Sequence, residues 1–207
     1  MKQNIFDTLA EEYEAWFVEN KTLFQSELLA LKKVVPVGKD GVEIGIGSGI
    51  FAEQLGIRSG IDPSENMLEY ARNRGLEVQK GVAEKLPYKD GSFDYVALIT
   101  AICFVDDPQQ SIKEAYRVLK KEGVIIIAII DKETTFGKFL NEGKEKSRFY
   151  KYARFFSTQE IVNLLETNSF RITRILQTLE NPATTIVENP TEGYGKGSFA
   201  VIESVKK

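Results

Sequence analysis

The sequence predicts an α/β fold built on a doubly wound, mostly parallel sheet, and three observations support this. Short apolar segments of β type alternate with helical segments five times between residues 41 and 131. A glycine-rich loop, 45–49, follows the first apolar segment and opens a helix, a common ligand-binding position in such sheets. The segment FDYVALIT, 93–100, is almost wholly apolar, as expected for a strand covered on both faces.

Length and composition agree with one globular domain. The chain has 207 residues, of which 43% are hydrophobic and 28% charged, and a formal net charge of −3. That charge gives no electrostatic reason to expect nucleic acid as a partner. The longest apolar run, 124–130, is too short to span a bilayer, so we expect no membrane span and a cytoplasmic location.

The chain contains no histidine and a single cysteine, Cys103. Mechanisms that need a histidine base, nucleophile or metal ligand are therefore excluded, among them Ser-His-Asp hydrolases, Cys-His proteases and most zinc enzymes. One cysteine can form no internal disulfide and cannot support a cysteine-based metal cluster. We expect no metal site.

The predicted elements follow one another without a linker or an internal repeat. Apolar residues recur near helical spacing over 5–34, with no central proline or glycine, so one helix is expected there. A strand over 41–46 and a short helix over 51–55 flank the glycine loop. Further strands are expected at 59–61, 76–84, 93–100 and 124–131.

Start and stop signals place two helices between these strands. Ser64 is the expected N-cap of a helix that ends at Gly75. Asp107 is the expected cap of the next helix, and Pro108 suits its first turn. The basic and glycine residues within 120–123 are expected to close that helix.

The C-terminal part departs from this alternation. Residues 132–156 form a long segment rich in aromatic side chains, and a helix is expected over 157–170. Two predicted strands, 170–179 and 197–205, then follow with no helix between them. We expect this pair to form an antiparallel hairpin on the sheet edge.

The glycine loop is the first candidate for a binding site. Free N–H groups at a helix start can face a ligand, and Gly45, Gly47 and Gly49 leave room for one. A dinucleotide fingerprint would have its third glycine at Ile50, so the spacing counts against a pyrophosphate. Asp62 follows the second strand, where it can accept the hydroxyls of a ribose. A plain structural turn remains the alternative for the loop and for Asp62.

Four blocks of the sequence together resemble a known family. VEIGIGSG, GIDPSENMLEYAR, GVAEKLPYKDGSFDYV and AICFVDDPQQSIKEAYRVLKKEG match, in order and spacing, the class I S-adenosylmethionine-dependent methyltransferases. The branch typified by ubiquinone and menaquinone biosynthesis methyltransferases is the most similar, over roughly residues 40 to 130. The resemblance implies a Rossmann-like, seven-stranded sheet with an antiparallel last strand and an N-terminal helical cover. It also implies S-adenosylmethionine as cofactor and S-adenosylhomocysteine as product.

The resemblance further assigns cofactor contacts. The first block would hold the methionine part and Asp62 the ribose, while the turns after the second and third strands would flank the adenine. The residues so implied are Glu43, Gly45, Gly47, Gly49, Asp62, Pro63, Ser64, Met67, Ala83, Glu84, Thr100 and Ala101. The last two match positions that face the reactive methyl group. Val82 departs from the family, which often has an aspartate there to accept from the adenine amino group.

Methyl transfer suits a chain without histidine. The cofactor supplies the activated group, so the protein mainly has to align the reactants. A neutral amine or a phenolate needs no base from the protein, whereas an alcohol usually does. The weak candidates for a base are Tyr13, Asp106 and Asp131, for which helix packing, a turn before a helix and a strand-end turn are the alternatives.

Two segments are expected to shape the site of a small-molecule acceptor. The helical cover, 1–37, carries Tyr13 and Trp16, and the lid, 132–156, carries aromatic side chains that can instead simply pack on the core. The lid candidates are Phe136, Phe149 and Tyr152. A single methyltransferase domain, 1–207, is thus divided into the cover, a cofactor-binding core at 38–131, the lid, and a helix with a terminal hairpin at 157–207.

Two other functions compete with this one. A protein that binds S-adenosylmethionine without catalysis would carry the same motifs. An NAD-dependent oxidoreductase shares the glycine loop and Asp62 but fails on the glycine spacing and on the third block. The identity of the acceptor, the atom that is methylated and the oligomeric state stay open.

Overall fold

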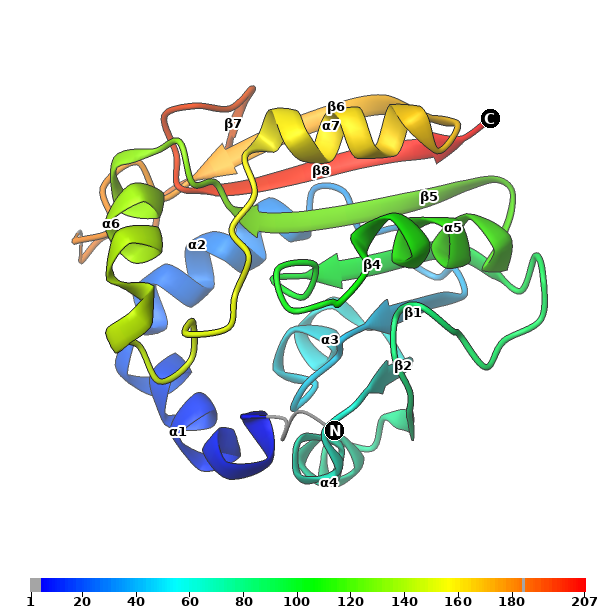
Figure 1. Ribbon diagram of the computed structural model, residues 1–207, viewed down its shortest axis with the longest axis horizontal. Helices are drawn as coiled ribbons and strands as arrows, with labels where there is room; N and C mark the ends of the chain where they lie inside the picture. Colours follow the sequence, from blue (N-terminus) through cyan, green and yellow to red (C-terminus); the bar gives the residue numbers. More distant parts are fainter. Residues whose placement is uncertain (1–4, 184) are drawn as a thin grey trace.

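The computed structural model describes residues 5–183 and 185–207. The strands are β1 Gly41–Ile44, β2 Ser59–Asp62, β3 Glu77–Lys80, β4 Phe93–Ile99, β5 Leu119–Ile130, β6 Phe170–Thr178, β7 Thr191–Glu192 and β8 Phe199–Lys206. They form an eight-stranded sheet in the order β3-β2-β1-β4-β5-β8-β6-β7 (Figure 1). The strands from β1 to β5 pair in parallel, whereas β8 runs antiparallel to both β5 and β6. The predicted mostly parallel sheet is confirmed.

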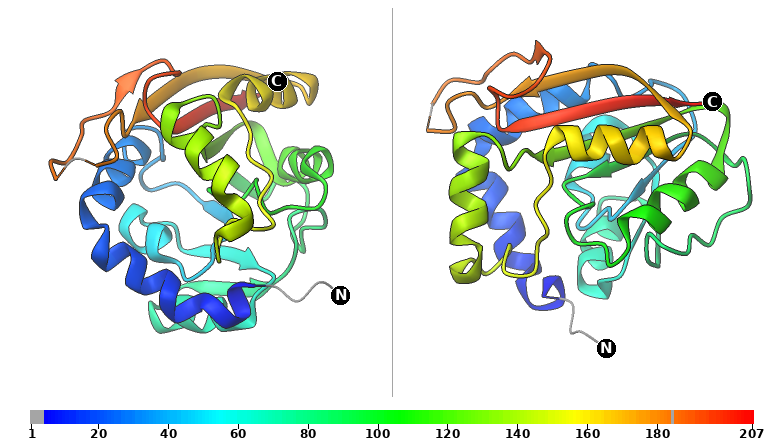
Figure 2. Two further views of the ribbon diagram at one scale, coloured as in Figure 1. Left: turned by 60° about the vertical axis from the view of Figure 1, so that its left-hand side comes forward. Right: turned by 45° about the horizontal axis from the view of Figure 1, so that its top comes forward.

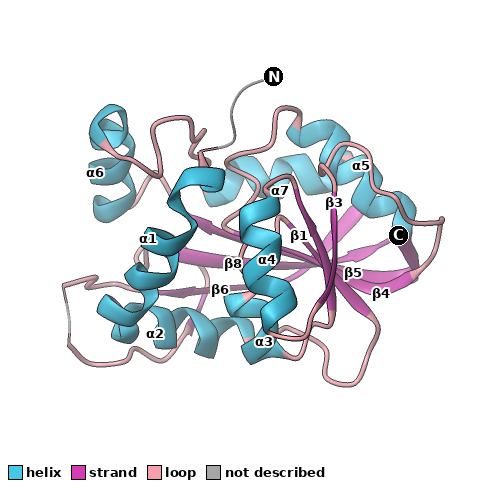
Figure 3. Ribbon diagram, turned by 90° about the horizontal axis from the view of Figure 1, so that it is seen from below, coloured by secondary structure: helices cyan, strands magenta, loops and turns pink. Residues whose placement is uncertain are grey.

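Helices cover both faces of this sheet. They are α1 Phe6–Glu19, α2 Lys21–Leu31, α3 Ile50–Leu55, α4 Glu65–Asn73, α5 Pro108–Val118, α6 Thr135–Gly143 and α7 Thr158–Thr167, with a 3-10 turn, η1, at Lys144–Lys146. Helices α5 and α7 pack on one face, and α2, α3 and α4 on the other (Figure 3). Helices α1 and α6 stand at the carboxyl ends of the parallel strands (Figures 1 and 2). Within the described ranges, no helix has the length and apolarity needed to cross a bilayer.

The core consists of two apolar layers separated by the sheet. Successive side chains of a strand point to opposite faces, so Ile125 and Ile127 of β5 pack with α5 and α7. Ile126 and Ala128 pack with the helices of the opposite face. This two-sided burial explains why the central strands read as continuous apolar runs.

The predicted C-terminal hairpin is present. Its second strand, β8, pairs with β5, and its first strand, β6, lies further toward the edge of the sheet. Strand β8 lies between β5 and β6, and the short strand β7 adds an eighth member on the outside, so the sheet exceeds the expected seven strands. Arg174 of β6 holds Glu192 by an ion pair of 2.6 Å, and the Gly193 N–H donates to the Ile175 carbonyl. These contacts secure the extra strand.

The expectation of one helix over 5–34 is wrong, because the segment breaks at Asn20. This residue has φ −109° and ψ 38°, outside the helical region. Its backbone N–H and its side-chain amide both donate to the carbonyl of Trp16, at 2.8 and 2.9 Å. They end α1, and α2 starts at the next residue in a new direction.

The expected end of the helix after Asp107 is also wrong. Helix α5 stops at Val118, and the basic residues assigned to its last turn belong to β5. Leu119 is fully buried and pairs with Phe93, whereas Val124 pairs with Tyr95. The residues between them bulge out of the ladder, with Glu122 at φ +60°.

The predicted helix caps are confirmed. The Ser64 hydroxyl accepts from the Met67 N–H at 3.3 Å, and the Asp107 carboxylate accepts from the Gln110 N–H at 3.0 Å. Both caps lie at the carboxyl edge of the sheet, and they fix where the chain turns beside the candidate site.

Candidate functional site

The glycine loop leaves the sheet at the end of β1 and leads into α3. Gly47 has φ +54°, and a Cβ built on it would meet no atom within 4 Å. Gly49 has φ +77°, and its Cβ would lie 2.4 Å from Cδ1 of Leu76. Gly49 therefore serves the packing of the loop, whereas Gly47 presents bare backbone to open space.

Asp62 ends β2, the neighbour of β1, and ties the loop to the next helix. One carboxylate oxygen accepts from the Gly47 N–H at 3.0 Å, and the other accepts from the Ser64 N–H at 2.8 Å. Burial raises the pKa of Asp62 to about 6, although these two N–H donors act to lower it. The geometry places this carboxylate directly beside the exposed backbone of Gly47.

Glu43 lies in the middle of β1 with only 2% of its surface exposed. Its Oε2 atom has no hydrogen-bond partner among the described residues. Burial, and then the charge of Asp62, raise the pKa of Glu43 well above its ordinary value. A buried carboxyl group left without a partner is costly, so the site fits a ligand that brings a positively charged donor.

The remaining cofactor positions expected from the sequence surround this loop. Ser64 is buried as the cap of α4, Met67 is buried behind it, and Pro63 is exposed. A Cβ added at Gly45 would lie 2.5 Å from the Cβ atom of Ala101, which follows β4. The ends of β1, β2 and β4 thus converge on one edge of the sheet.

The turn after β3 is held by contacts to the segment before α5. The Glu84 carboxylate accepts from the N–H groups of Asp106 and Asp107, at 2.8 and 3.0 Å. Ala83 is buried in the core, while Val82 is 46% exposed. The carboxylate of Glu84 therefore makes hydrogen bonds that hold this turn against the segment before α5. The side chain of Val82 presents an apolar surface at the same turn.

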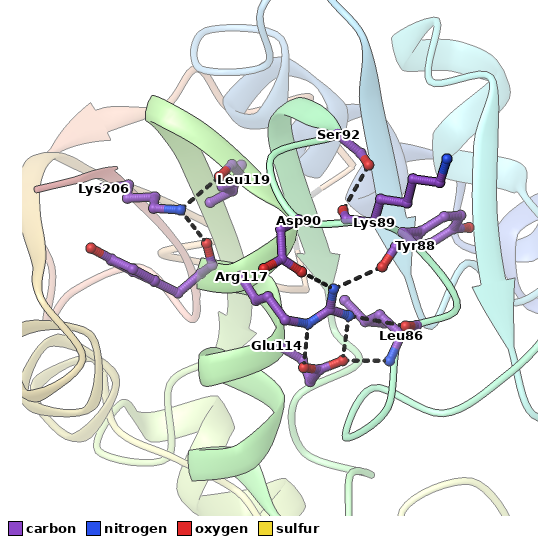
Figure 4. A network of polar contacts seen from close by, with 10 residues as sticks. Leu86, Tyr88, Lys89, Asp90, Ser92, Glu114, Arg117, Leu119 and Lys206 are labelled. Carbon is purple, nitrogen blue, oxygen red and sulfur yellow. Dashed lines mark hydrogen bonds and ion pairs between the residues drawn. The ribbon is translucent and has the colours of Figure 1, made fainter.

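Arg117 of α5 fixes the loop that follows this turn (Figure 4). Its guanidinium group donates to the carboxylates of Glu114 and Asp90 and to the carbonyls of Leu86 and Tyr88, at 2.7 to 3.0 Å. Glu114 in turn accepts from the Leu86 N–H at 2.7 Å. Sequence reasoning missed this role, although the spacing of Glu114 and Arg117 on the helix was a signal for an ion pair.

Tyr13 reaches the site from α1. Burial raises the pKa of its phenol, and the charges of Glu43, Tyr150, Glu27 and Asp62 raise it further. Its ring meets Phe149 edge-on, with the ring centroids 6.4 Å apart. Trp16 instead meets its neighbour Phe17 edge-on, with the ring centroids 5.0 Å apart. Of the aromatic side chains expected to shape the acceptor site, Tyr13 and Phe149 are brought together.

The other two lid aromatics lie elsewhere. Phe136 stacks on Phe139 within α6, with centroids 6.4 Å apart. Tyr152 is 65% exposed, and the ammonium group of Lys151 lies 5.7 Å from its ring centroid. Neither residue lines the cavity at the carboxyl edge.

A small, largely enclosed gap of about 20 Å³, the space of about one water molecule, lies where β4 and β5 end, beneath the segment 147–156. It is lined by Thr100, Cys103, Ile129, Ile130, Tyr150, Phe155 and Phe156. Thr100 has φ +49°, a conformation that residues other than glycine rarely adopt and that concentrates at functional sites. Burial raises the pKa of Cys103 to about 12, so this residue is a thiol that donates to the Thr100 carbonyl.

Polar contacts hold α1 against the glycine loop and the start of α4. Glu14 pairs with Arg74 at 2.5 Å, and Arg74 also donates to the carbonyl of Ser48 in the glycine loop. Nearer the start of the helix, the Ser64 hydroxyl donates to the carboxylate of Asp7 at 2.6 Å. Arg74 therefore joins α1 to the glycine loop, and Ser64 joins α1 to the start of α4.

Asp131 and Asp106 are the other two candidates for a base, and each lies in a turn that hydrogen bonds hold in place. Asp131 is buried, and its carboxylate accepts from the Glu133 N–H and from both the N–H and the hydroxyl of Thr158. Asp106 lies in the turn before α5, where its N–H is bound by Glu84. Both positions agree with a structural role for these aspartates.

The fold and this site define a class of protein. A doubly wound sheet, a glycine loop after β1 and an acid at the end of β2 form the frame on which α/β enzymes bind a nucleoside-bearing cofactor. The loop offers one bare backbone position, and the Oε2 atom of the buried Glu43 carboxyl group has no partner among the described residues, which suits an amino acid moiety better than a phosphate. The class is that of S-adenosylmethionine-dependent methyltransferases.

Comparisons with known proteins agree with this class. A family model described as a methyltransferase domain matches residues 42–127. A crystal structure from Thermotoga maritima, described as an S-adenosylmethionine-dependent methyltransferase and possible histamine N-methyltransferase, has 48% sequence identity and a TM-score of 0.95. The match covers 98% of this chain and 99% of that one.

Two further relatives extend the comparison. An uncharacterised protein of Methanocaldococcus jannaschii is 41% identical over 204 residues, which cover 98% of this chain and 99% of the relative. The ubiquinone/menaquinone biosynthesis C-methyltransferase of Geotalea daltonii is 30% identical over 146 residues, 60% of this chain and 61% of the relative. This chain belongs to the class I S-adenosylmethionine-dependent methyltransferases and resembles the ubiquinone and menaquinone branch.

Proposed function

We propose that this enzyme transfers the methyl group of S-adenosylmethionine to a small-molecule acceptor, mainly by aligning the two reactants. The observation that carries the proposal is the unpartnered Oε2 atom of Glu43 beside the open backbone of Gly47. Glu43 would accept from the amino group of the cofactor's methionine part, and Asp62 would accept from the ribose hydroxyls. The apolar surface of Val82 would lie against the adenine.

When bound, the cofactor supplies a methyl group activated on a sulfonium. The protein's own residues then have to orient an acceptor and exclude water. Thr100 and Tyr150 would bound the acceptor side of the site, and Tyr13 would close it from the cover. We propose that the cover, 1–37, and the lid, 132–156, act in this way on one domain, and that the enzyme works in the cytoplasm.

Thermal unfolding tests the cofactor assignment. A ligand at about 100 times its dissociation constant adds about 2.7 kcal/mol to the free energy of unfolding. For a domain of this size, that should raise the midpoint by several degrees. We expect S-adenosylhomocysteine to give this shift and NADH at the same concentration to give none. A shift with NADH alone would contradict the proposal.

Turnover tests the reaction itself. Labelled S-adenosylmethionine is incubated with the enzyme and a panel of amines, phenols, alcohols and carboxylates, with histamine included because of the Thermotoga relative. Transfer of label to at least one acceptor is expected. Binding of S-adenosylhomocysteine without transfer to any acceptor would instead favour a protein that binds the cofactor without catalysis.

A further inference from the structure

One serine joins the proposed ribose site to the cover. The Ser64 N–H donates to Oδ1 of Asp62 at 2.8 Å, and the Ser64 hydroxyl donates to Oδ1 of Asp7 at 2.6 Å. The other carboxylate oxygen of Asp62 accepts from the Gly47 N–H at 3.0 Å. A continuous series of hydrogen bonds therefore runs from the glycine loop, through Asp62 and Ser64, to the first turn of α1, where Asp7 lies.

The Ser64 hydroxyl needs an acceptor for its proton. Ser64 is fully buried, and its oxygen already accepts from the Met67 N–H at 3.3 Å as the cap of α4. A buried hydroxyl whose proton has no acceptor is costly. The Asp7 carboxylate, at 2.6 Å, is a charge-assisted acceptor, which is the stronger kind. If α1 moved away, the Ser64 hydroxyl would lose this acceptor.

The contacts of α1 differ in what they lead to. Beside its bond to Ser64, Asp7 accepts through its backbone carbonyl from the side-chain amide of Asn66. One turn further along α1, Glu12 pairs with Arg148 of the lid at 2.6 Å, and both side chains are largely exposed. The contact through Ser64 leads to the acid of the proposed ribose site, whereas the pair with Arg148 leads to the lid.

Asp62 keeps the capacity to accept from a ligand. A carboxylate has about four acceptor sites, and the N–H groups of Gly47 and Ser64 use one on each oxygen. The sites that remain suit the two hydroxyl groups of a ribose. Because the two N–H groups fix the orientation of the Asp62 carboxylate, a residue that holds Ser64 also positions these remaining sites.

We propose that Asp7 is a positioning residue that couples closure of α1 to binding of the ribose at Asp62, with Ser64 as the link. This inference rests on the proposed function and names how access to the same site is regulated. When α1 is closed, Asp7 holds Ser64, and Ser64 holds Asp62 in the orientation that accepts the ribose. By linkage, a bound ribose favours the same conformation of Ser64 and so stabilises the closed α1.

A purely structural role for Asp7 leads to a different expectation. An acid in the first turn of a helix stabilises that helix whether or not a ligand is bound. Loss of such a role would speed the opening of α1 by the same factor in the free and the bound enzyme. Coupling instead changes the ratio between the two states, so this ratio is the quantity to measure.

Hydrogen exchange of α1, in free enzyme and in enzyme saturated with S-adenosylhomocysteine, gives this ratio. We expect the ligand to slow exchange in the wild type. Asp7→Ala should reduce this slowing factor by about fivefold or more, and the affinity for S-adenosylhomocysteine, measured by calorimetry, should fall by a similar factor. Asp7→Asn keeps an acceptor oxygen for the Ser64 hydroxyl, so this variant should recover part of both losses.

Two controls separate coupling from the loss of a contact in general. Glu12→Gln removes the charge pair with Arg148 and should leave the slowing factor unchanged, even where α1 opens faster in both states. In a Ser64→Ala background the link is already absent, so Asp7→Ala should cause no further loss of affinity.

The outcomes that would overturn the inference are distinct from those that bear on the cofactor. A slowing factor in Asp7→Ala equal to that of the wild type would show that Asp7 only stabilises its helix. Additive losses of affinity for Asp7→Ala and Ser64→Ala would show that the two residues act independently, which also contradicts the proposal. Failure of the wild type to bind S-adenosylhomocysteine would instead count against the proposed function.

Discussion

Two glycines, one before β1 and one in the glycine loop, allow the effect of a substitution on folding to be distinguished from its effect on binding. Gly38 and Gly47 both have positive φ, +71° and +54°, and open space where a Cβ would stand. Gly38→Ala and Gly47→Ala should therefore each destabilise the fold by about 1–2 kcal/mol, the cost of a left-handed alanine. Only the methyl group at residue 47 would enter the proposed cofactor site.

We expect Gly47→Ala to weaken S-adenosylhomocysteine binding by about tenfold or more, and Gly38→Ala to leave it unchanged. Calorimetric titration measures the affinity, and urea unfolding measures the shared loss of stability. Equal affinities for the two variants would show that the cofactor lies away from residue 47.

Glu43 should make cofactor binding release protons. Its raised pKa means that the free protein holds a proton that the unfolded chain would lose. An amino group bound at Oε2 favours the carboxylate, so the pKa falls on binding and the proton departs. Affinity should then increase with pH until Glu43 is ionised in the free protein as well.

Titrations with S-adenosylhomocysteine in two buffers of different ionisation enthalpy, at several pH values above the ordinary carboxyl pKa, measure the protons released. Glu43→Gln should release fewer protons and bind more weakly, whereas Glu69→Gln, at an exposed acid on α4, should match the wild type. Proton uptake by the wild type would contradict this role.

At the scale of the elements, Arg74 links α1 to the glycine loop. Its guanidinium group contacts Glu14 of α1, Glu53 of α3 and the carbonyl of Ser48. Arg72, two residues earlier, pairs with Glu65 of its own helix, and both side chains are largely exposed.

Arg74→Ala should cost about 1–3 kcal/mol of stability, since it leaves partly buried partners unsatisfied. Arg72→Ala should stay within about 0.5 kcal/mol of the wild type. Hydrogen exchange should report faster opening of α1 in Arg74→Ala alone. Unchanged exchange in that variant would mean that apolar packing, not Arg74, holds the cover.

Local chemistry decides which elements could be predicted. Ser64 and Asp107 act on N–H groups three residues away, so their caps could be predicted from the sequence. Asn20 ends a helix by a similarly local bond to Trp16, but the uninterrupted apolar pattern on both sides concealed it. The change from α5 to β5 depends on the pairing of Leu119 with Phe93, which no local signal indicates.

The same distinction between local signals and long-range contacts decides which residues of the functional site could be predicted. The glycine loop and Asp62 carry family motifs, so their positions could be predicted, and the fold brings them together as expected. Glu27 belongs to no motif, and its raised pKa comes from burial that only the folded chain produces. Arg117 likewise acts on the carbonyls of Leu86 and Tyr88, which only the folded chain brings to it.

The stability of the whole molecule should depend on these buried acids. The pKa of Asp62 is raised to about 6 and that of Glu27 to about 8, so the folded state keeps protons that the unfolded chain releases. Their contribution to stability is fully present below the unfolded pKa and is lost as pH rises through the folded value. Glu114, whose pKa is lowered by its bond to Arg117, acts in the opposite sense at more acidic pH.

The free energy of unfolding of the free enzyme should therefore be higher at about pH 6 than at about pH 8.5, with a slope of at most about 1.4 kcal/mol per pH unit for each proton. Urea unfolding at both values measures it. Glu27→Gln should reduce the difference, and an identical slope in this variant would show that Glu27 is ionised in the folded state throughout.

The position of β8 has a consequence for how the chain acquires its structure. This strand is the last in sequence order, yet it pairs with β5 and β6 on either side. Until residues 199–206 have left the ribosome, the apolar edge of β5 has no neighbour, and the sheet ends at the strand that will later lie at its middle. Until that segment has been made, the partly synthesised chain exposes an unpaired apolar strand edge, which favours misassembly with other chains.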